Sequence, residues 1–508
     1  MNLAIDDNSM VSENAVALGK LLDGLDCRVI GDVTGVEVSD LANDSRKVKP
    51  NDLFFAVPGY KLDGTRFIPE AASMGAVGIV TQTEIKGLDH IPVIVCDDIR
   101  RVMSRISASF FGYPAKSLKM IGVTGTNGKT TITYMLGHLL GQMGERYGKL
   151  GTVEYSTGKR VIQAINTTPD TIEIQRMLAE MRDSKLSGCV MEVSSHGLDQ
   201  ARCDDIEYSA AVFTNLTQDH LDYHKDFEGY FRAKSILFEK LLKSDGIAVL
   251  NANDPYSERL RELSPGEVIT YSAIINGSQT QVADIVLLDK GYMNNRRNYE
   301  VKYKGKTYFG SIPYLGKFNL MNAAASLATL VGLGYDLEGA IKAMISAPQV
   351  PGRVEKIEGG QPFEVIIDYA HTPDALENLL TGVSTNGRKI VVFGCGGDRD
   401  KTKRPIMGQV AAKYGDLVFV TSDNPRTENP RRIIDDILVG IPSDITYEVI
   451  EKRDEAICRA MESAGENDLV IIAGKGHEDY QVIGNTRHYF SDPKVVEGQL
   501  KKMGYAGS

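Results

Sequence analysis

Short apolar runs that each end in a polar or glycine-rich loop recur along the chain, and this pattern constrains the fold most strongly. Helical stretches separate the runs, which lie within 118–144, 188–198, 208–220, 245–255, 363–374, 389–400, 416–426 and 468–478. Strands that alternate with helices form parallel sheets covered on both faces. Ligands bind such sheets outside the carboxyl ends of the strands, so we expect the loops after the last four runs to share one crevice.

The length of the chain and its breaks predict several domains. At 508 residues the chain is too long for one core, and about three domains are expected. The first hundred residues alternate short β-rich runs with turns, and a polar, β-patterned stretch covers Val282 to Pro313. Two prolines and a glycine in "APQVPGRVE" mark a boundary. We predict an α/β protein of three domains, at 1–116, 117–347 and 348–508.

Composition excludes several classes of protein. The chain has 42% hydrophobic and 24% charged residues, as soluble globular proteins do, and its net charge of −10 argues against a sequence-independent grip on nucleic acid. No apolar run approaches the roughly 20 residues of a membrane span. The acidic N-terminal residues 1–16 lack the order of a signal peptide. Six scattered cysteines favour neither zinc nor a disulfide framework, and we expect a cytoplasmic protein (Cys27, Cys96, Cys189, Cys203, Cys395, Cys458).

The segment "GTNGKTT" predicts a phosphate-binding loop, with Gly125, Thr126, Asn127, Gly128, Lys129, Thr130 and Thr131 around a nucleotide. Glycines let backbone N–H groups turn toward phosphate oxygens, and the helix that follows presents its positive N-terminal end. Lys129 would reach the β- and γ-phosphates, and the Thr130 hydroxyl would hold Mg²⁺. The usual first glycine of this motif is replaced by Val123. The alternative is a glycine turn that only connects strand to helix.

Three further positions carry chemistry in the same region. Glu192 ends an apolar strand, where a carboxylate directed at Mg²⁺ is expected. His220 follows another strand, although a lone histidine is more often structural. Lys234 lies among apolar residues at helical spacing, where a lysine whose stem packs on the core is the simpler interpretation.

Taken together, the motifs resemble the Mur ligases, the ATP-dependent amide-forming enzymes of bacterial cell-wall precursor synthesis. The resemblance covers nearly the whole chain and is closest to the members that add the third amino acid. It rests on "NDSRKVKPNDLFFAVPG", "GTNGKTT", "NTTPD", "MEVSSHGL", "FTNLTQDHLDYH", "YFRAKSILF", "GKFNLMNAAAS", "PGRVE", "DYAHTPDAL", "GCGGDRDKTKRP", "DNPRTE" and "AGKGHE".

The resemblance implies a reaction, its partners and a role for each domain. ATP would phosphorylate the γ-carboxylate of UDP-N-acetylmuramoyl-L-alanyl-D-glutamate, and the amine of meso-diaminopimelate would displace phosphate from the acyl phosphate. The implied architecture is an N-terminal UDP-sugar-binding α/β domain, a central P-loop ATPase domain with a parallel sheet, and a C-terminal Rossmann-like domain that brings the amino acid. ATP and Mg²⁺ are the implied cofactors. We expect a monomer without nucleic-acid partners or membrane insertion.

The resemblance also implies roles for individual residues. Glu192 and His220 match the family's Mg²⁺ ligands, and Lys234 matches a lysine that is carbamylated in the family, so that it becomes an anion able to orient a metal. Only a neutral amine reacts with CO₂, and burial favours the neutral form. Residues matching UDP-sugar peptide contacts are Ser45, Asn166, Thr167, Thr168, Ser194, Gln200 and Arg202. Residues matching ATP-side or interdomain positions are Asn319, Asn322, Arg353, Asp368 and His371; for Asn322, a buried asparagine that satisfies neighbouring backbone fits nearly as well.

Arg426 in "DNPR" predicts which amino acid is added. Diaminopimelate differs from lysine by a second, distal carboxylate. A guanidinium binds a carboxylate in a bidentate fork, whereas bound lysine would leave the positive charge of this arginine without a counter-charge. The arrangement resembles the diaminopimelate-adding members of the family. The residues that complete the implied pocket are Arg399, Asp423, Asn424, Pro425, Gly474 and Glu478, with Glu478 suited to the distal ammonium.

Two other functions compete with this interpretation. Folylpolyglutamate synthase shares the phosphate loop and a two-domain core, but it lacks the N-terminal UDP-sugar domain and the DNPR loop. A nucleotide-binding regulator without catalysis would have no need of Lys129, Glu192, His220 and Lys234 together.

Overall fold

The computed structural model describes residues 15–59, 63–88, 90–275 and 282–505. Most of the acidic N-terminal stretch that argued against a signal peptide lies outside these residues. Within them, no helix has both the length and the apolar character needed to cross a membrane. The described residues form two compact units. The first comprises those within Met1–Gly122, Arg146–Ser209 and Ile236–Lys243, and the second those within Val123–Glu145, Ala210–Ser235 and Ser244–Ser508.

The N-terminal part of the first unit is a five-stranded sheet in the order β2-β7-β6-β5-β4. Strands β4 to β7 are parallel and β2 is antiparallel at the edge. Leu53 and Phe55 pack with α3 on one face, while Phe54 and Ile79 pack with α2 on the other. The elements are α1 (Leu18–Leu22), β2 (Arg28–Ile30), β4 (Asp40–Ala42), β5 (Asp52–Phe55), α2 (Ile68–Ser73), β6 (Gly78–Thr81), β7 (Val93–Val95) and α3 (Ile99–Phe110).

The middle of the chain contributes a sheet in the order β11-β10-β9-β12-β8-β13-β14-β15-β16-β17-β18. Its strands are β8 (Lys119–Thr124), β9 (Tyr147–Leu150), β10 (Glu154–Ser156), β11 (Val161–Gln163), β12 (Gly188–Glu192), β13 (Tyr208–Phe213), β14 (Leu242–Asn251), β15 (Glu267–Ile274), β16 (Ile285–Met293), β17 (Arg296–Tyr303) and β18 (Lys306–Ile312). Strands β9 and β12 pair in parallel, as do β14, β15 and β16. The strands predicted before each of the four central loops are therefore present.

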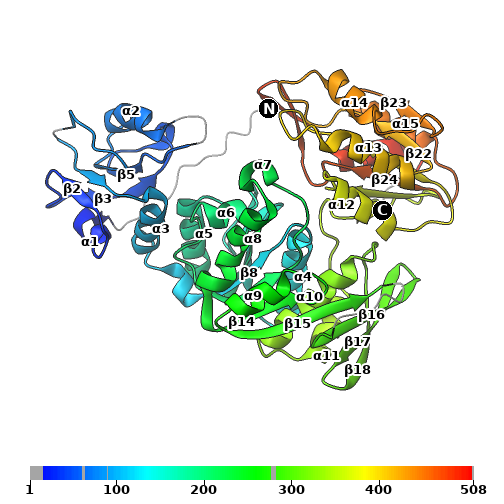
Figure 1. Ribbon diagram of the computed structural model, residues 1–508, viewed down its shortest axis with the longest axis horizontal. Coiled ribbons are helices and arrows are strands. Elements are labelled where there is room, and N and C mark those ends of the chain that lie inside the picture. The colour runs from blue at the N-terminus through cyan, green and yellow to red at the C-terminus, as the bar shows by residue number, and fades with distance from the viewer. Residues whose placement is uncertain (1–14, 60–62, 89, 276–281, 506–508) are drawn as a thin grey trace. The chain divides into compact units, whose positions relative to one another are not determined.

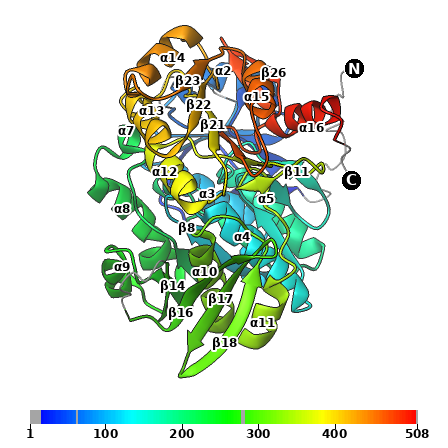
Figure 2. The same cartoon turned by 90° about the vertical axis from the view of Figure 1, so that its right-hand side faces the viewer.

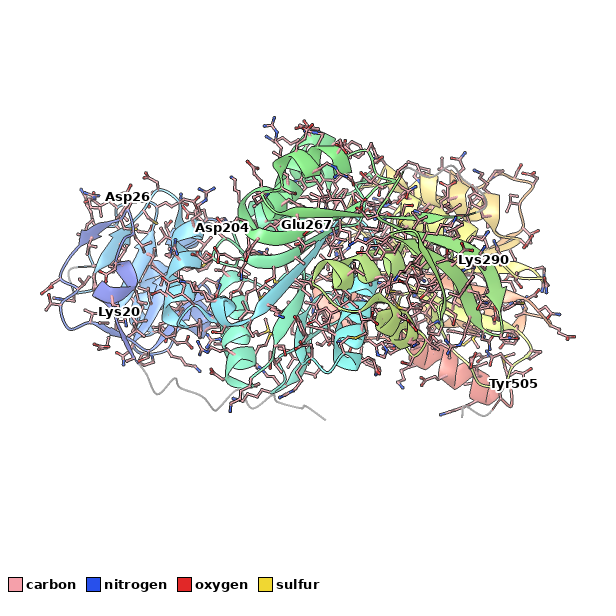
Figure 3. All side chains as sticks on the ribbon, turned by 90° about the horizontal axis from the view of Figure 1, so that it is seen from below. Lys20, Asp26, Asp204, Glu267, Lys290 and Tyr505 are labelled. Carbon is pink, nitrogen blue, oxygen red and sulfur yellow. The ribbon has the colours of Figure 1, made fainter. Side chains whose placement is uncertain are left out.

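Both ends of this sheet depart from the parallel arrangement expected from the sequence. Strands β10 and β11 are antiparallel, and so are β16, β17 and β18, which lie side by side in Figures 1 and 2. Asn294 and Asn295 join β16 to β17 with φ of 54° and 58°, and Lys304 and Gly305 join β17 to β18 with φ of 46° and 74°. Two-residue turns with positive φ at both positions close antiparallel hairpins. Lys290 of β16, labelled in Figure 3, pairs with Glu300 of β17 at 2.7 Å.

Helices follow most strands of this region along the chain. Helix α10 packs against α4 and β15. The buried Ala323, Ala324 and Ala328 leave room for close packing. The helices are α4 (Lys129–Gln142), α5 (Thr171–Asp183), α6 (Ser195–Asp199), α7 (Leu221–His224), α8 (Phe227–Ile236), α9 (Ser257–Leu263), α10 (Asn319–Gly332) and α11 (Leu337–Met344).

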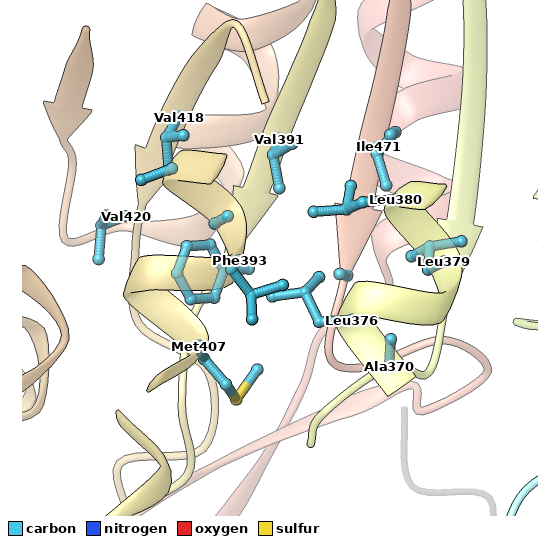
Figure 4. Packing of buried hydrophobic residues seen from close by; sticks show 14 of the residues in the cluster. Ala370, Leu376, Leu379, Leu380, Val391, Phe393, Met407, Val418, Val420 and Ile471 are labelled. Atoms are coloured by element: carbon cyan, nitrogen blue, oxygen red, sulfur yellow. The ribbon is translucent and has the colours of Figure 1, made fainter. Parts of the chain in front are cut away.

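The C-terminal part of the chain contains a third sheet, in the order β19-β20-β24-β21-β22-β23. Strands β20 to β24 pair in parallel, so the four loops predicted to share a crevice leave the same edge. Buried residues cover both faces, with Phe393 and Met407 on one and Phe419 and Ile472 on the other (Figure 4 shows the first). The elements are β19 (Glu355–Lys356), β20 (Glu364–Asp368), α12 (Pro373–Gly382), β21 (Lys389–Phe393), α13 (Lys403–Tyr414), β22 (Leu417–Val420), α14 (Pro430–Leu438), β23 (Tyr447–Val449), α15 (Arg453–Glu462), β24 (Leu469–Ala473), β25 (Tyr480–Ile483), β26 (Thr486–Tyr489) and α16 (Asp492–Lys502).

Candidate functional site

The loop between β8 and α4 takes its shape from two glycines. Gly125 has φ of 144°, and a Cβ there would lie 1.8 Å from Thr214 Oγ1. Gly128 has φ of 91°, and a Cβ there would lie 2.6 Å from Asn322 Oδ1. Val123 stands where the usual motif has glycine because this residue is still part of β8 and fully buried. Helix α4 begins directly after Gly128 without a side-chain cap, so its first N–H groups face an anion site.

The loop after β13 holds the phosphate loop from its other side. Asn127 N donates to Asn215 Oδ1 at 2.9 Å, and Thr214 Oγ1 donates to Asn127 O at 2.6 Å. Thr217 N donates to Thr126 Oγ1 at 3.0 Å. These bonds fix the main chain of the phosphate loop before any ligand arrives, which lowers the cost of ordering it on binding.

Lys129 and Thr130 lie at the start of α4. Lys129 Nζ donates to Gly125 O and Thr126 O, each at 2.8 Å, so its ammonium sits across the mouth of the loop. Thr130 is buried, and its Oγ1 accepts a hydrogen bond from Arg353 Nη2 at 3.2 Å. A lysine and a hydroxyl at these positions suit phosphate oxygens and a divalent cation.

Lys234 is buried under the phosphate loop, with 1% of its surface exposed. Its Nζ donates to Gly125 O at 2.9 Å and lies 4.4 Å from the centre of the Tyr230 ring. Burial and the nearby positive charge of Lys129 hold the pKa of Lys234 well below its ordinary value, against a smaller opposing effect of Asp219. The amine is therefore poised to be neutral, as reaction with CO₂ requires.

His220 lies in the loop that precedes α7, with φ of 54°. Its Nε2 is 3.3 Å from Asp219 Oδ2. Partial burial lowers the pKa of His220, and the charges of Lys129 and Lys234 add to this while Asp219 opposes it. Although burial acts to raise it, the positive charges of His220, His371, Lys129 and Lys234 leave the pKa of Asp219 below its ordinary value. A neutral imidazole is the form that binds metals.

Glu192 ends β12 in the first unit and is almost fully buried. Its Oε1 accepts from Thr152 N at 2.8 Å and its Oε2 from Thr152 Oγ1 at 2.9 Å. A Cβ on Gly151 would lie 2.4 Å from Oε1, so this glycine makes room for the carboxylate. The carboxylate is thus held in one orientation, as a metal ligand must be.

The structure brings most predicted UDP-sugar peptide contacts into one network around Glu192. Thr168 Oγ1 donates to Glu192 O at 2.9 Å and accepts from Ser194 N at 2.9 Å. Arg202 donates to Thr168 O at 2.7 Å and to Gln200 Oε1 at 2.6 Å. Two further predicted residues border this network: Thr167, whose Oγ1 is 3.1 Å from Thr152 Oγ1, and the exposed Asn166, whose N donates to Tyr155 OH at 2.9 Å. Ser45 lies apart from it in sequence and donates to Glu70 Oε2 at 2.5 Å.

The predicted ATP-side residues fall into two groups within the second unit. Asn322 Nδ2 donates to Asn319 Oδ1 at 2.9 Å, so these two buried amides are linked next to Gly128. Asp368 accepts from Val354 N and Ala370 N, each at 2.8 Å. Burial raises the pKa of Asp368, against the lowering effect of Arg353. The remaining residue, His371, has its Nδ1 2.8 Å from Tyr369 O.

The loops after β22 and β24 build a polar pocket in the C-terminal part of the chain. Asp423 and Asn424 are buried at the end of β22. Asn424 Nδ2 donates to Glu478 Oε2 at 3.0 Å, and Tyr369 OH donates to Glu478 Oε1 at 3.5 Å. Gly474 has φ of 118°, and a Cβ there would lie 3.3 Å from Asp423 Oδ2. The structure thus brings these four predicted pocket residues together.

Arg426 follows the same loop and is half-buried, with φ of 52°. Its Nη1 donates to Gly397 O at 2.7 Å, its N donates to Val482 O at 3.0 Å, and its O accepts from Gly484 N at 2.7 Å. The backbone of Arg426 is therefore anchored on both sides. Pro425 lies against the loop after β21, since a Cβ on Gly397 would lie 1.9 Å from Pro425 O. Arg399 is exposed, with its Nη1 3.5 Å from Asp398 O.

Two residues of these networks received no role from the sequence. Asp374 Oδ2 accepts from Asn127 Nδ2 at 2.9 Å and from Thr217 Oγ1 at 3.1 Å, so it steadies the phosphate loop. Lys475 is fully buried beside Asp423 and Glu478. Both lie inside motifs that the sequence singled out, but only their distant partners reveal what they do.

Comparison with known proteins decides the family. The Mur ligase family catalytic domain matches residues 37–110, the Mur ligase middle domain matches 123–330, and the Mur ligase glutamate ligase domain matches 352–476. A relative from Gloeobacter violaceus, named UDP-N-acetylmuramoyl-L-alanyl-D-glutamate–2,6-diaminopimelate ligase, is 44% identical over 494 residues, which cover 96% of this chain and 99% of that protein. The chain belongs to the Mur ligase family.

Solved structures agree with this membership. A structure of a protein with the same ligase name as that relative has a TM-score of 0.66 and 32% identity, and the match covers 97% of this chain and 100% of that one. Folylpolyglutamate synthase from Mycobacterium tuberculosis, complexed with ADP and AMPPCP, has a TM-score of 0.60 and 18% identity, and covers 73% of this chain and 92% of its own. At that identity the likeness is one of fold alone. The predicted three-domain α/β architecture of a Mur ligase is thereby confirmed.

Proposed function

We propose that this Mur ligase joins meso-2,6-diaminopimelate to the γ-carboxylate of D-glutamate in UDP-N-acetylmuramoyl-L-alanyl-D-glutamate, a step of bacterial peptidoglycan precursor synthesis driven by ATP. The observation that carries the proposal is the match, 44% identical over 96% of the chain, to a ligase named for these substrates. The anchored Arg426 and the polar pocket beside it support the choice of amino acid.

Chemistry explains why such an enzyme needs a phosphate loop. A carboxylate is a poor acylating group, so the γ-carboxylate oxygen first attacks the γ-phosphorus of ATP and ADP leaves. The neutral amine of the amino acid then attacks the acyl carbon, the C–O bond to phosphate breaks, and inorganic phosphate departs. Phosphorylation thus replaces one difficult step by two steps with lower barriers. Lys129 and the first turn of α4 would bind the phosphates and stabilise their negative charge.

The donor groups that the family resemblance assigns to Mg²⁺ suit this ion in part. Glu192 offers a carboxylate whose orientation Thr152 fixes, and Thr130 offers a buried hydroxyl, which are the oxygen ligands that Mg²⁺ prefers. His220 offers a nitrogen, with its pKa lowered toward the neutral form. We propose that these residues hold the metal, which would neutralise phosphate charge.

Carbamylation of Lys234 is part of the proposal. The amine attacks CO₂, a C–N bond forms, and the proton released goes to solvent, which leaves an anionic carbamate. Burial and the charge of Lys129 lower the pKa of Lys234 and so favour the neutral amine, and the positive charge of Lys129 also favours the anionic product. Carbon-13 NMR of the protein in ¹³C-bicarbonate would detect the carbamate carbon, and its absence from Lys234→Met would assign it.

The remaining roles extend the proposal over the whole chain. Domain 1–116 would bind the UDP-sugar with Ser45, domain 117–347 would bind ATP and carry out the chemistry, and domain 348–508 would bring the amino acid. Asn166, Thr167, Thr168, Ser194, Gln200 and Arg202 would contact the muramoyl dipeptide. The protein would act as a monomer in the cytoplasm.

The folate alternative is disfavoured by the N-terminal part of the chain. The Mur ligase family catalytic domain matches residues 37–110, and the folylpolyglutamate synthase fold covers 73% of the chain against 96% for the named ligase relative. The "DNPR" loop, which folylpolyglutamate synthase lacks, resembles that of the diaminopimelate-adding ligases.

Product analysis with each substrate omitted in turn tests the proposal. Incubation with ATP, Mg²⁺, the UDP-muramoyl dipeptide and meso-diaminopimelate should yield one product whose mass equals the dipeptide plus diaminopimelate minus water. Omission of any one substrate should abolish it. A product with glutamate added to a folate substrate, or no amide product at all, would refute the proposed function.

A further inference from the structure

A lysine ammonium is enclosed in the polar pocket of the C-terminal part of the chain. Lys475 is 0% exposed, and its Nζ lies 3.4 Å from Asp423 Oδ1, 3.2 Å from Asn424 Oδ1 and 3.1 Å from Glu478 Oε2. Burying an ammonium is costly unless it is paired and hydrogen-bonded, and this one is paired with both carboxylates. All three partners are residues that the proposed function assigns to amino-acid binding.

The backbone conformation around Lys475 directs this side chain into the pocket. Gly474 and Gly476 flank it with φ of 118° and 54°, conformations that side chains rarely adopt. A Cβ on Gly476 would lie 2.8 Å from Gly352 O and 2.8 Å from Tyr369 Cβ. The Gly-Lys-Gly triplet therefore reverses the chain directly after β24, and the lysine between the glycines points beneath the loop that carries Asp423.

Lys475 also determines which polar atoms are left for a ligand. The Oδ1 of Asn424 is fully engaged, since it accepts from Lys475 and from Val482 N at 2.9 Å, and its Nδ2 donates one N–H to Glu478. Lys475 and Asn424 both contact Glu478 Oε2, so Oε1, which has one long contact of 3.5 Å with Tyr369 OH, is the oxygen able to accept a further donor. The hydrogen bonds from Lys475 Nζ therefore help to fix the side-chain orientations of Asn424 and Glu478.

Lys475, Asp423 and Glu478 form a cluster of charged side chains within the pocket, with two carboxylates beside one ammonium. The nearby Arg453, also fully buried, is paired with Asp492 at 2.7 Å, so its charge is already balanced. The cluster thus contains one carboxylate more than it contains ammonium groups, and this suits a single substrate ammonium.

We propose that Lys475 is a positioning residue of the amino-acid pocket. It holds Asn424 and Glu478 in their binding orientations, and it balances one of the two carboxylates of the cluster so that the other matches one substrate ammonium. This inference rests on the proposed function and deepens it. It predicts that Lys475 acts on the affinity for the amino acid and not on the affinity for ATP or for the UDP-muramoyl dipeptide.

Steady-state kinetics of Lys475→Met, compared with wild type, test the assignment. Methionine keeps the apolar stem but removes the charge and the three polar contacts. The KM for meso-diaminopimelate should rise about tenfold or more, the scale of an uncompensated buried charge, while the KM values for ATP and for the UDP-muramoyl dipeptide stay within about twofold. Lys452→Met is the matched control, because Lys452 is 72% exposed and is paired with Glu455 on the surface; all its KM values should equal those of wild type.

A double variant separates charge matching from folding. Lys475→Met/Asp423→Asn restores the net charge of the pocket, so its KM for meso-diaminopimelate should lie below that of Lys475→Met, even if the single variant unfolds at a lower temperature. A KM at or above that of the single variant would overturn the charge argument. Equal changes in all three KM values would overturn the positioning role. Absence of turnover by wild type counts against the proposed function, whereas normal wild-type turnover with an unchanged variant KM counts against Lys475 alone.

Discussion

Lys234 Nζ donates a hydrogen bond of 2.9 Å to the carbonyl oxygen of Gly125, although 109 positions of sequence separate the two residues. The same carbonyl accepts from Lys129 at 2.8 Å. Two lysines from different helices thus converge on one oxygen of the phosphate loop, and burial together with the charge of Lys129 lowers the pKa of Lys234. The buried lysine can escape this repulsion by becoming an anion, which is the physical reason for proposing a carbamate there.

Replacing Lys234 by methionine should separate catalysis from stability. We expect kcat to fall about a hundredfold or more, as when a preorganised electrostatic group is removed, while the melting temperature does not fall. The reason is that methionine needs no counter-charge when buried, and Gly125 O keeps its hydrogen bond from Lys129. Phosphate release and thermal unfolding measure the two effects. A kcat within a few-fold of wild type would show that Lys234 is only a packed core lysine.

Two alanine substitutions, one directly before α4 and one within it, test the phosphate loop. Gly128→Ala should weaken ATP binding, because its φ of 91° is unfavourable for alanine by about 1–2 kcal/mol and its Cβ would collide with Asn322 Oδ1. Gly141→Ala, within α4, meets nothing within 4 Å and should raise stability by about 0.5–1 kcal/mol. The shift in melting temperature on adding ATP and Mg²⁺ reports binding. Equal ATP-induced shifts in the two variants would contradict the loop geometry.

The local parts of this site were predictable from sequence, and the long-range parts were not. The strand, glycine turn and helix around Lys129 follow from neighbouring residues, so their positions agree with the prediction. Asp374 and Lys475 owe their roles to partners such as Asn127 and Asp423, far away in sequence, and no local pattern encodes such pairs.

The same contrast holds for the fold. The parallel order of the C-terminal strands was predictable because each strand ends in a loop and is followed by a helix. The antiparallel strands β17 and β18 were not, although Asn294 and Asn295 are residues that tolerate positive φ. Turn chemistry at these two positions overrides the alternation of strands and helices that dominates the rest of the sheet.

Arg426 should control the choice between diaminopimelate and lysine. Arg426→Ala removes the guanidinium proposed to bind the distal carboxylate, and such charged hydrogen bonds are worth about 1.5–3 kcal/mol, so the KM for meso-diaminopimelate should rise about 10- to 100-fold. The KM for L-lysine should not rise. Arg431→Ala, which removes a surface arginine paired with Asp435 in α14, is the control and should change neither value. If Arg426→Ala left the selectivity ratio unchanged, the arginine would have no part in recognition.

His371 should make the protein less stable in mild acid. Burial and the charge of Lys403 lower the pKa of His371 below 6.5. As the pH falls through the window just below 6.5, the unfolded state therefore takes up a proton before the folded state does, and the free energy of unfolding decreases. Urea unfolding at a series of pH values should show a shallower decrease for His371→Gln than for wild type. His488→Gln, at an exposed position of β26, should retain the wild-type slope, and a wild-type slope in His371→Gln would disprove the prediction.

The central claim is that this Mur ligase activates the muramoyl dipeptide with ATP and selects diaminopimelate through Arg426. The most direct test is the rate of phosphate release with ATP, Mg²⁺ and the UDP-muramoyl dipeptide, measured with meso-diaminopimelate and with L-lysine in parallel. Release with diaminopimelate and little with lysine is the predicted result. Equal rates would leave a ligase without the proposed selectivity, and no release with either amino acid would contradict the proposed function itself.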